Sequence, residues 1–134
     1  MTRWTLSFCA GIAISGLAAH AHHSIAAVYD GGRQLRVEGT VLRFQFVNPH
    51  PLLTIEVTDR SGIAQQWLLE MDNRSELASV GMTAETLKPS DRVVVTGSLA
   101  RTEANRLYIY RLDRPADGFR YEQVGSSPRV RKAG

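Results

Sequence analysis

Three histidines of this chain are candidate metal ligands, and two of them lie next to a cleavage site near its start. The triplet Ala19-His20-Ala21 is the small-x-small pattern after which signal peptidase cuts, and this cut makes His22 the first residue. A terminal histidine chelates a metal ion through its α-amine and its own Nδ1, and a second imidazole completes three nitrogen ligands. Such nitrogen-rich planar sets favour Cu(II). His22 and His50 are therefore candidate copper ligands.

The third histidine and the position of the cut leave alternatives open. His23 cannot easily share the plane of a chelate at His22, so it is an alternative ligand or a neighbour of the site. A cut after Ala19 would instead give the terminus His20-Ala21-His22, where a histidine in third position also binds copper. In the purely structural interpretation the terminal histidines bind nothing and His50, between two prolines, caps a turn.

Aromatic residues form a second candidate site, a ligand face. Tyr108 and Tyr110 lie two residues apart, so they share one face of a strand. Asn48, in the turn after the first predicted strand, is a further candidate on this ligand face. Phe44 and Phe46 also alternate, but their apolar surroundings favour packing in the core over stacking against a ligand.

No set of catalytic residues converges in the sequence. Glu70 and Asp72 are the candidate carboxylates, and both lie close to large apolar residues. For both, a structural role is the favoured interpretation: an ion pair with an arginine for Glu70 and support of a helix cap for Asp72. The chain has no Ser-His-Asp order, no glycine-rich phosphate loop and no HExxH motif. We therefore expect a protein that is not an enzyme.

Residues 1–21 have the pattern of a secretory signal peptide. Arg3 is the only charge before Asp30, and residues 5–19 are all apolar or small. This apolar run of about 15 residues is shorter than the roughly 20 that a membrane-spanning helix needs, so we expect no integral span after processing. The single cysteine, Cys9, would leave with the signal, which excludes disulfides and thiolate metal sites. We expect a periplasmic or secreted bacterial protein.

The charge balance of the remaining chain indicates no nucleic-acid partner. Removal of residues 1–21 leaves 113 of the 134 residues, enough for one domain. In this part 15 basic residues face 13 acidic ones, which is too small an excess to attract an anionic polymer. If the protein has a partner, we expect another exported protein.

Apolar residues recur at every second position and predict a mainly β chain of five strands. The strands cover residues 35–46, 53–58, 64–71, 93–97 and 107–112. In the first strand the apolar phase changes after Val41, and Gly39 just before this change predicts a bulge there. A short helix over 73–82, capped by Asn73 and closed by Gly81, separates the third strand from the fourth. This order fits a small OB-like Greek-key barrel, with a different small barrel or sandwich as the alternative.

The predicted domain limits follow from these elements. Residues 22–34 form an N-terminal segment, 35–115 the barrel, and 116–134 a C-terminal extension. From about residue 126 the extension is basic and has no apolar period, so we expect it to be disordered. The predicted core residues are apolar positions on the inner faces of the strands: Leu53, Ile55, Trp67, Val93 and Val95.

Several short motifs follow one another along the chain. They are Ala21-His22-His23-Ser24, Gly39-Thr40-Val41, Asn48-Pro49-His50, Trp67 with Glu70, Gly81-Met82-Thr83, Leu87 to Val93, and Gly97. In the order and spacing of these motifs, over roughly residues 21–115, the chain resembles DUF6152, a family of small exported bacterial proteins of unknown function. Met82 and Ser90 depart from the tryptophan and glycine usual there. The resemblance implies export and a small β-rich domain, and it implies no activity.

Two functions fit these observations. The first is a non-enzymatic exported binding module that carries copper at its terminal histidine. The second is a metal-free accessory subunit that presents its barrel face or a sheet edge to another exported protein.

We predict that the exported protein begins at His22, with His20 as the alternative start. Intact-mass analysis or Edman sequencing of the exported protein measures this directly. Retention of Met1 would contradict both the compartment and the N-terminal chelate, because each depends on the cut.

Overall fold

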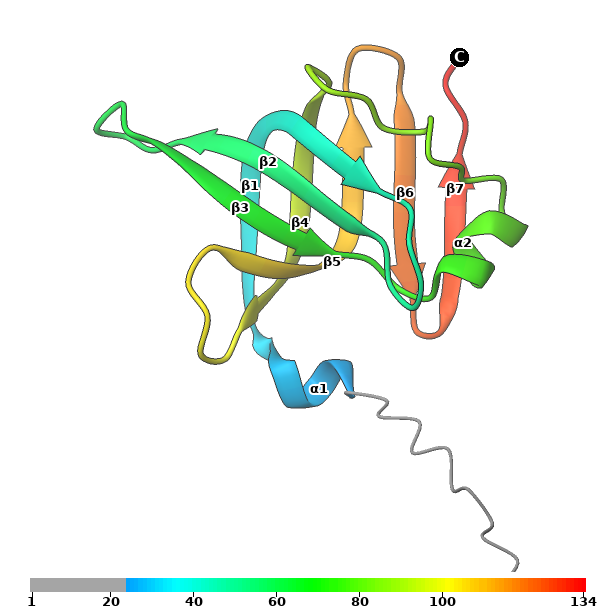
Figure 1. Ribbon diagram of the computed structural model, residues 1–134, viewed down its shortest axis with the longest axis horizontal. Helices are drawn as coiled ribbons and strands as arrows, with labels where there is room; N and C mark the ends of the chain where they lie inside the picture. The colour runs from blue at the N-terminus through cyan, green and yellow to red at the C-terminus, as the bar shows by residue number, and fades with distance from the viewer. Residues whose placement is uncertain (1–23) are drawn as a thin grey trace, which may run out of the picture.

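Seven strands and two short helices make up residues 24–134, the part of the chain that the computed structural model describes (Figure 1). In chain order they are α1 (Ile25–Val28), β1 (Tyr29–Gln45), β2 (Leu52–Thr58), β3 (Ala64–Glu70), α2 (Arg74–Ser79), β4 (Arg92–Ala100), β5 (Arg106–Arg114), β6 (Phe119–Val124) and β7 (Ser127–Arg131). The prediction of a mainly β fold is confirmed. The predicted five strands and one helix were too few. In this part of the chain no helix has the length and apolar character needed to cross a membrane.

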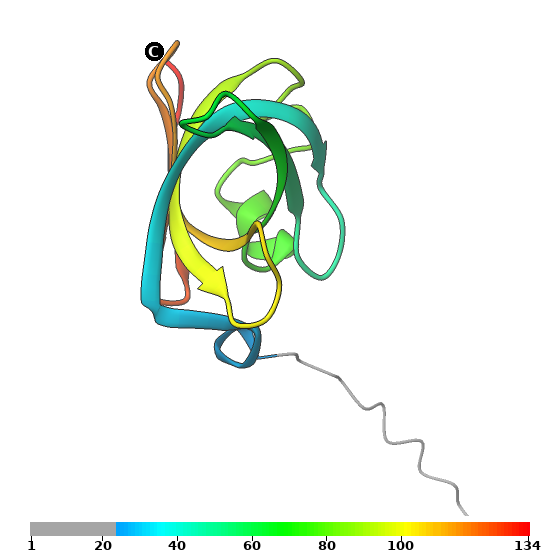
Figure 2. The same cartoon turned by 90° about the vertical axis from the view of Figure 1, so that its left-hand side faces the viewer.

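The strands form one sheet that curls back on itself. Its order is β3-β2-β1-β4-β5-β6-β7, and β3 also pairs with β5. This second pairing is parallel and joins Leu68, Leu69 and Glu70 to Arg106, Leu107 and Tyr108. It closes a ring of β1, β2, β3, β5 and β4, which Figure 2 shows end-on. The last two strands, β6 and β7, continue the sheet from β5 outside the ring.

Aliphatic side chains fill the inside of the ring. Leu53, Ile55, Val93 and Val95 are fully buried there, as the alternation predicts. The fifth predicted core residue, Trp67, is only half-buried and packs against this core from its margin. The helix α2 and the turns after it add further buried residues, namely Leu77, Met82 and Leu87. The inward positions of the strands therefore make the core, with α2 and its turns covering one side.

The first strand is longer than predicted and breaks at a different residue. β1 begins at Tyr29, so residues 29–34 belong to this strand. The pairing of β1 with β2 shifts register between Val41 and Arg43, which places the bulge at Leu42. The predicted bulge at Gly39 was wrong. Gly39 is needed for another reason, because a Cβ atom there would overlap the backbone carbonyl of Glu56 on β2.

The C-terminal residues form a hairpin, so the predicted disorder from about residue 126 was wrong. β6 and β7 pair antiparallel, with Tyr121 opposite Val130. Gly125 has a φ of 60°, and with the next residue it makes a two-residue turn between the strands. Phe119 and Tyr121 are buried, and Val130 packs against the same core. Burial of these side chains holds the hairpin against the barrel.

We predict that Gly39→Ala lowers the free energy of unfolding by about 1–3 kcal/mol, because the added methyl group meets the backbone of β2 and β1 must shift. Denaturant melts of the protein measure this loss. Gly31→Ala in the same strand is the matched control, since its nearest neighbour is the Tyr110 hydroxyl oxygen at 3.9 Å. Equal midpoints for the two variants would show that β1 and β2 do not approach closely at Gly39.

Candidate functional site

Glu70 is the centre of a hydrogen-bond cluster at one end of the barrel. It is the last residue of β3, and its side chain is 14 % exposed. Its Oε1 accepts a hydrogen bond from His50 Nδ1 at 2.7 Å. Its Oε2 accepts one from the Tyr29 hydroxyl at 2.5 Å and one from the Arg106 guanidinium at 3.0 Å. One carboxylate therefore joins the start of β1, the β1–β2 connection and the start of β5.

These contacts fix the charges of Glu70, Tyr29 and Arg106. Burial by itself raises the pKa of Glu70, but the hydrogen bonds from Tyr29, His50 and Arg106 outweigh it and hold that pKa below its ordinary value. Burial and the bond to Glu70 raise the pKa of Tyr29 well above that of a free phenol. At neutral pH the cluster thus contains a carboxylate, a guanidinium and a neutral phenol.

The bond to Glu70 also fixes the tautomer of His50. An ionised carboxylate only accepts hydrogen bonds, so Nδ1 of the neutral ring carries the proton and Nε2 keeps a free lone pair. Among residues 24–134 no group hydrogen-bonds to Nε2. The side chain is 20 % exposed. His50 is therefore an oriented imidazole with one nitrogen available to a ligand.

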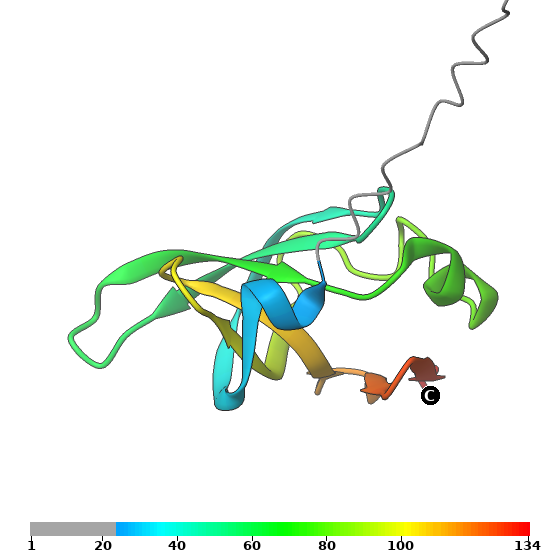
Figure 3. The same ribbon diagram turned by 90° about the horizontal axis from the view of Figure 1, so that it is seen from below.

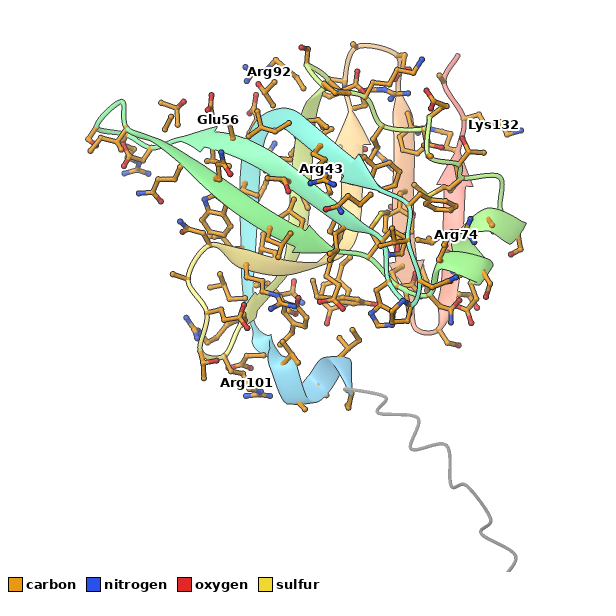
Figure 4. All side chains as sticks on the ribbon, in the orientation of Figure 1. Arg43, Glu56, Arg74, Arg92, Arg101 and Lys132 are labelled. Carbon is orange, nitrogen blue, oxygen red and sulfur yellow. The ribbon has the colours of Figure 1, made fainter. Side chains whose placement is uncertain are left out.

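The connection that carries His50 is held in place on both sides. The Pro49 carbonyl accepts the backbone N–H of Arg74 at 2.9 Å, and the Pro51 carbonyl accepts that of Met71 at 3.0 Å. The side chain of Arg74, labelled in Figure 4, donates to the Phe46 carbonyl at 2.9 Å and lies over the Phe46 ring. The start of α2 thus anchors the connection, which keeps His50 beside Glu70.

The predicted aromatic ligand face is not open at Tyr108. This residue is 4 % exposed, and its hydroxyl donates to Asp72 at 3.0 Å. Its ring packs between those of Tyr29 and Tyr110, with centroids 5.7 and 5.5 Å away. Tyr110 is half-buried, whereas Asn48 is exposed in the connection that carries His50. Tyr108 is buried because α1 and the start of β1 cover the face of β5 that points away from the aliphatic core.

His22 and His23, which the sequence predicts to lie at the processed terminus, are outside the described residues. The described chain starts at Ser24, directly before α1, and the residue after α1 is Tyr29. Figures 1 and 3 show α1 on the lower side of the barrel and the β1–β2 connection to the right of it. Within residues 24–134 no three side chains of His, Cys, Asp or Glu gather to hold a metal ion.

Sequence reasoning found part of this cluster. The predicted ion pair of Glu70 with an arginine is confirmed, with Arg106 as the partner. Asp72 assists the start of α2 as predicted, because its carboxylate accepts the backbone N–H of Asn73 at 2.7 Å. Tyr29 was missed, because the residues around it show no alternation that would place it on a strand. No signal in the sequence connected Glu70 with His50.

We predict that Glu70→Gln lowers the free energy of unfolding by about 1–3 kcal/mol, because the partly buried donors of Tyr29 and Arg106 lose their charged acceptor. Thermal or denaturant melts measure this loss. Glu103→Gln is the matched control, because Glu103 pairs with the same arginine but is 55 % exposed, and such pairs contribute at most about 1 kcal/mol. Losses of equal size would show that Glu70 is no more than a surface partner.

Comparison with known proteins places the chain in a family without giving it an activity. No curated protein matches the sequence. A family of unknown function, DUF6152, matches residues 10–107, which include α1, β1 to β4, α2 and the start of β5. The match thus includes Tyr29, His50, Glu70 and Arg106. Because it covers well over half of the 134 residues, the chain belongs to the DUF6152 family.

Proposed function

We propose that this protein is an exported, non-enzymatic binding module that holds Cu(II) between His50 and a mature N-terminus at His22. The observation that carries this proposal is the His50–Glu70 pair, in which Nδ1 is bound at 2.7 Å and Nε2 is left for a ligand. Metal-binding histidines usually donate their second ring N–H to such a carboxylate, which fixes the ring and makes the ligating nitrogen more basic.

The arrangement of the strands supports a binding role. We infer that the ring is an OB-like barrel, and its strand order β1-β2-β3-β5-β4 with the parallel β3–β5 pairing supports this inference. In such barrels the connections β1–β2 and β4–β5 contact the ligand. Here the first connection carries His50, and the second leads directly into Arg106. Both end at the Glu70 cluster.

The proposed site takes its other donors from the terminus. One imidazole holds copper weakly, whereas the α-amine and Nδ1 of a terminal histidine add two nitrogens and make a set that favours Cu(II). His22 is two residues before Ser24, and two extended residues span about 7 Å. The end of α1 is tied to the His50–Glu70 pair through Tyr29, so the described chain starts near this pair. The spacing is compatible with a shared site.

The alternative is a metal-free accessory subunit of another exported protein. Apolar side chains exposed around the end of β1 favour it: Leu42 is 38 % exposed and Val47 41 %. Such a surface suits a protein contact better than a metal ion. Copper binding separates the two proposals, because the accessory role requires none.

We predict that the processed protein starting at His22 binds one Cu(II), and that His50→Ala weakens this binding by at least about tenfold, because an oriented nitrogen ligand is lost. Competition against a chromophoric chelator measures the affinity, and the visible absorption of bound Cu(II) reports the nitrogen ligands. One extra residue before His22 should weaken binding similarly, since it removes the terminal chelate.

Val47→Ala is the matched control, because Val47 lies in the same connection, is exposed and carries no metal donor. It should bind Cu(II) like the unchanged protein. If neither His50→Ala nor the extra residue weakens binding, the shared site does not exist. If the processed protein binds no Cu(II), the accessory role is the remaining proposal.

A further inference from the structure

The outer edge of β3 is unpaired along its first half. β3 pairs with β2 over all of Ala64–Glu70, but its pairing with β5 begins only at Leu68. The hairpin of β2 and β3 projects beyond the ring on the left of Figure 1. The N–H of Leu68 donates to Asn105 on the β5 side. Because strands repeat every two residues, the backbone N–H and C=O groups of Ala64 and Gln66 point to this same side, away from β2.

This edge lacks the features by which natural strands avoid edge pairing. The seven residues from Ile63 to Leu69 contain no charge, no proline and no glycine. The strand at the other end of the sheet, β7, carries Pro128, Arg129 and Arg131. Of the two end strands only β3 therefore offers a free edge that a second strand can join without meeting a like charge.

We propose that a second copy of this chain pairs antiparallel with the first along Ala64–Gln66 of β3. A two-fold axis at Gln65 sets Ala64 opposite Gln66 of the second copy, and the outward groups of these residues then form reciprocal hydrogen bonds. The same register sets Ile63 opposite Trp67 of the second copy. Ile63 is 59 % exposed and Trp67 is half-buried, so pairing covers apolar surface that the barrel leaves open.

Self-complementarity favours a second copy over an unrelated strand. Each copy brings both the exposed isoleucine and the partly exposed tryptophan that this register joins. No charge lies at the axis, whereas a β7–β7 contact would place arginines of the two copies close together. The interface contains neither His50 nor the chain terminus, so it is independent of the proposed copper site.

Sedimentation velocity of the processed protein in EDTA, over a wide range of concentration, tests the proposal, and EDTA excludes dimers bridged by metal. The mass should rise from monomer toward dimer with concentration.

Gln66→Pro removes an outward N–H, which a free edge tolerates, and Gln66→Lys adds a charge at the edge. Both variants should remain monomers, with circular dichroism as the check on folding. Thr58→Lys is the matched control, because it adds the same charge on β2 of the same hairpin, and it should dimerise normally.

Two results would overturn the proposal. The first is an unchanged protein that stays monomeric at every concentration, which would leave the edge to a strand of a different protein. The second is association that both Gln66 variants retain, because such a dimer would use another surface.

Discussion

The parallel pairing of β3 with β5 is the contact on which the rest of the structure depends. It involves only Leu68–Glu70 and Arg106–Tyr108, yet it turns a curled sheet into a closed ring. Closure encloses the aliphatic core, since Leu69 and Leu107 face inward from the two paired strands. It also brings Glu70 to the start of β5, where Arg106 meets it. The aliphatic core and the Glu70 cluster therefore both depend on the pairing of β3 with β5.

The sequence was most informative where side chains alternate between core and solvent. This pattern located the ring strands and the buried positions Leu53 and Val95, since a strand with one buried face repeats every two residues. It could not locate the bulge in β1, because a bulge at Gly39 and a bulge at Leu42 both account for the change in which positions of the strand are apolar. The terminal hairpin had a signal, the Gly125–Ser126 turn between β6 and β7, but basic residues around it suggested a solvated tail.

The candidate site was harder to predict because it joins residues far apart in the chain. An ion pair for Glu70 followed from a carboxylate among apolar neighbours. Its bond to His50 depends on the docking of the β1–β2 connection against α2, which local patterns do not encode. The burial of Tyr108 depends on α1 and Tyr29 covering the second face of β5. A strand buried on both faces shows no alternation, so its outward tyrosines looked available to a ligand.

The burial of the Glu70 cluster has a consequence for how it responds to dissolved salt. Ions screen charges in contact with water far more than charges inside the protein. The Arg92–Glu38 pair on the barrel surface, 67 % and 50 % exposed, weakens as ionic strength rises. The Arg106–Glu70 pair, 23 % and 14 % exposed, is largely shielded from these ions. The geometry around His50 is therefore maintained across solutions of very different salinity.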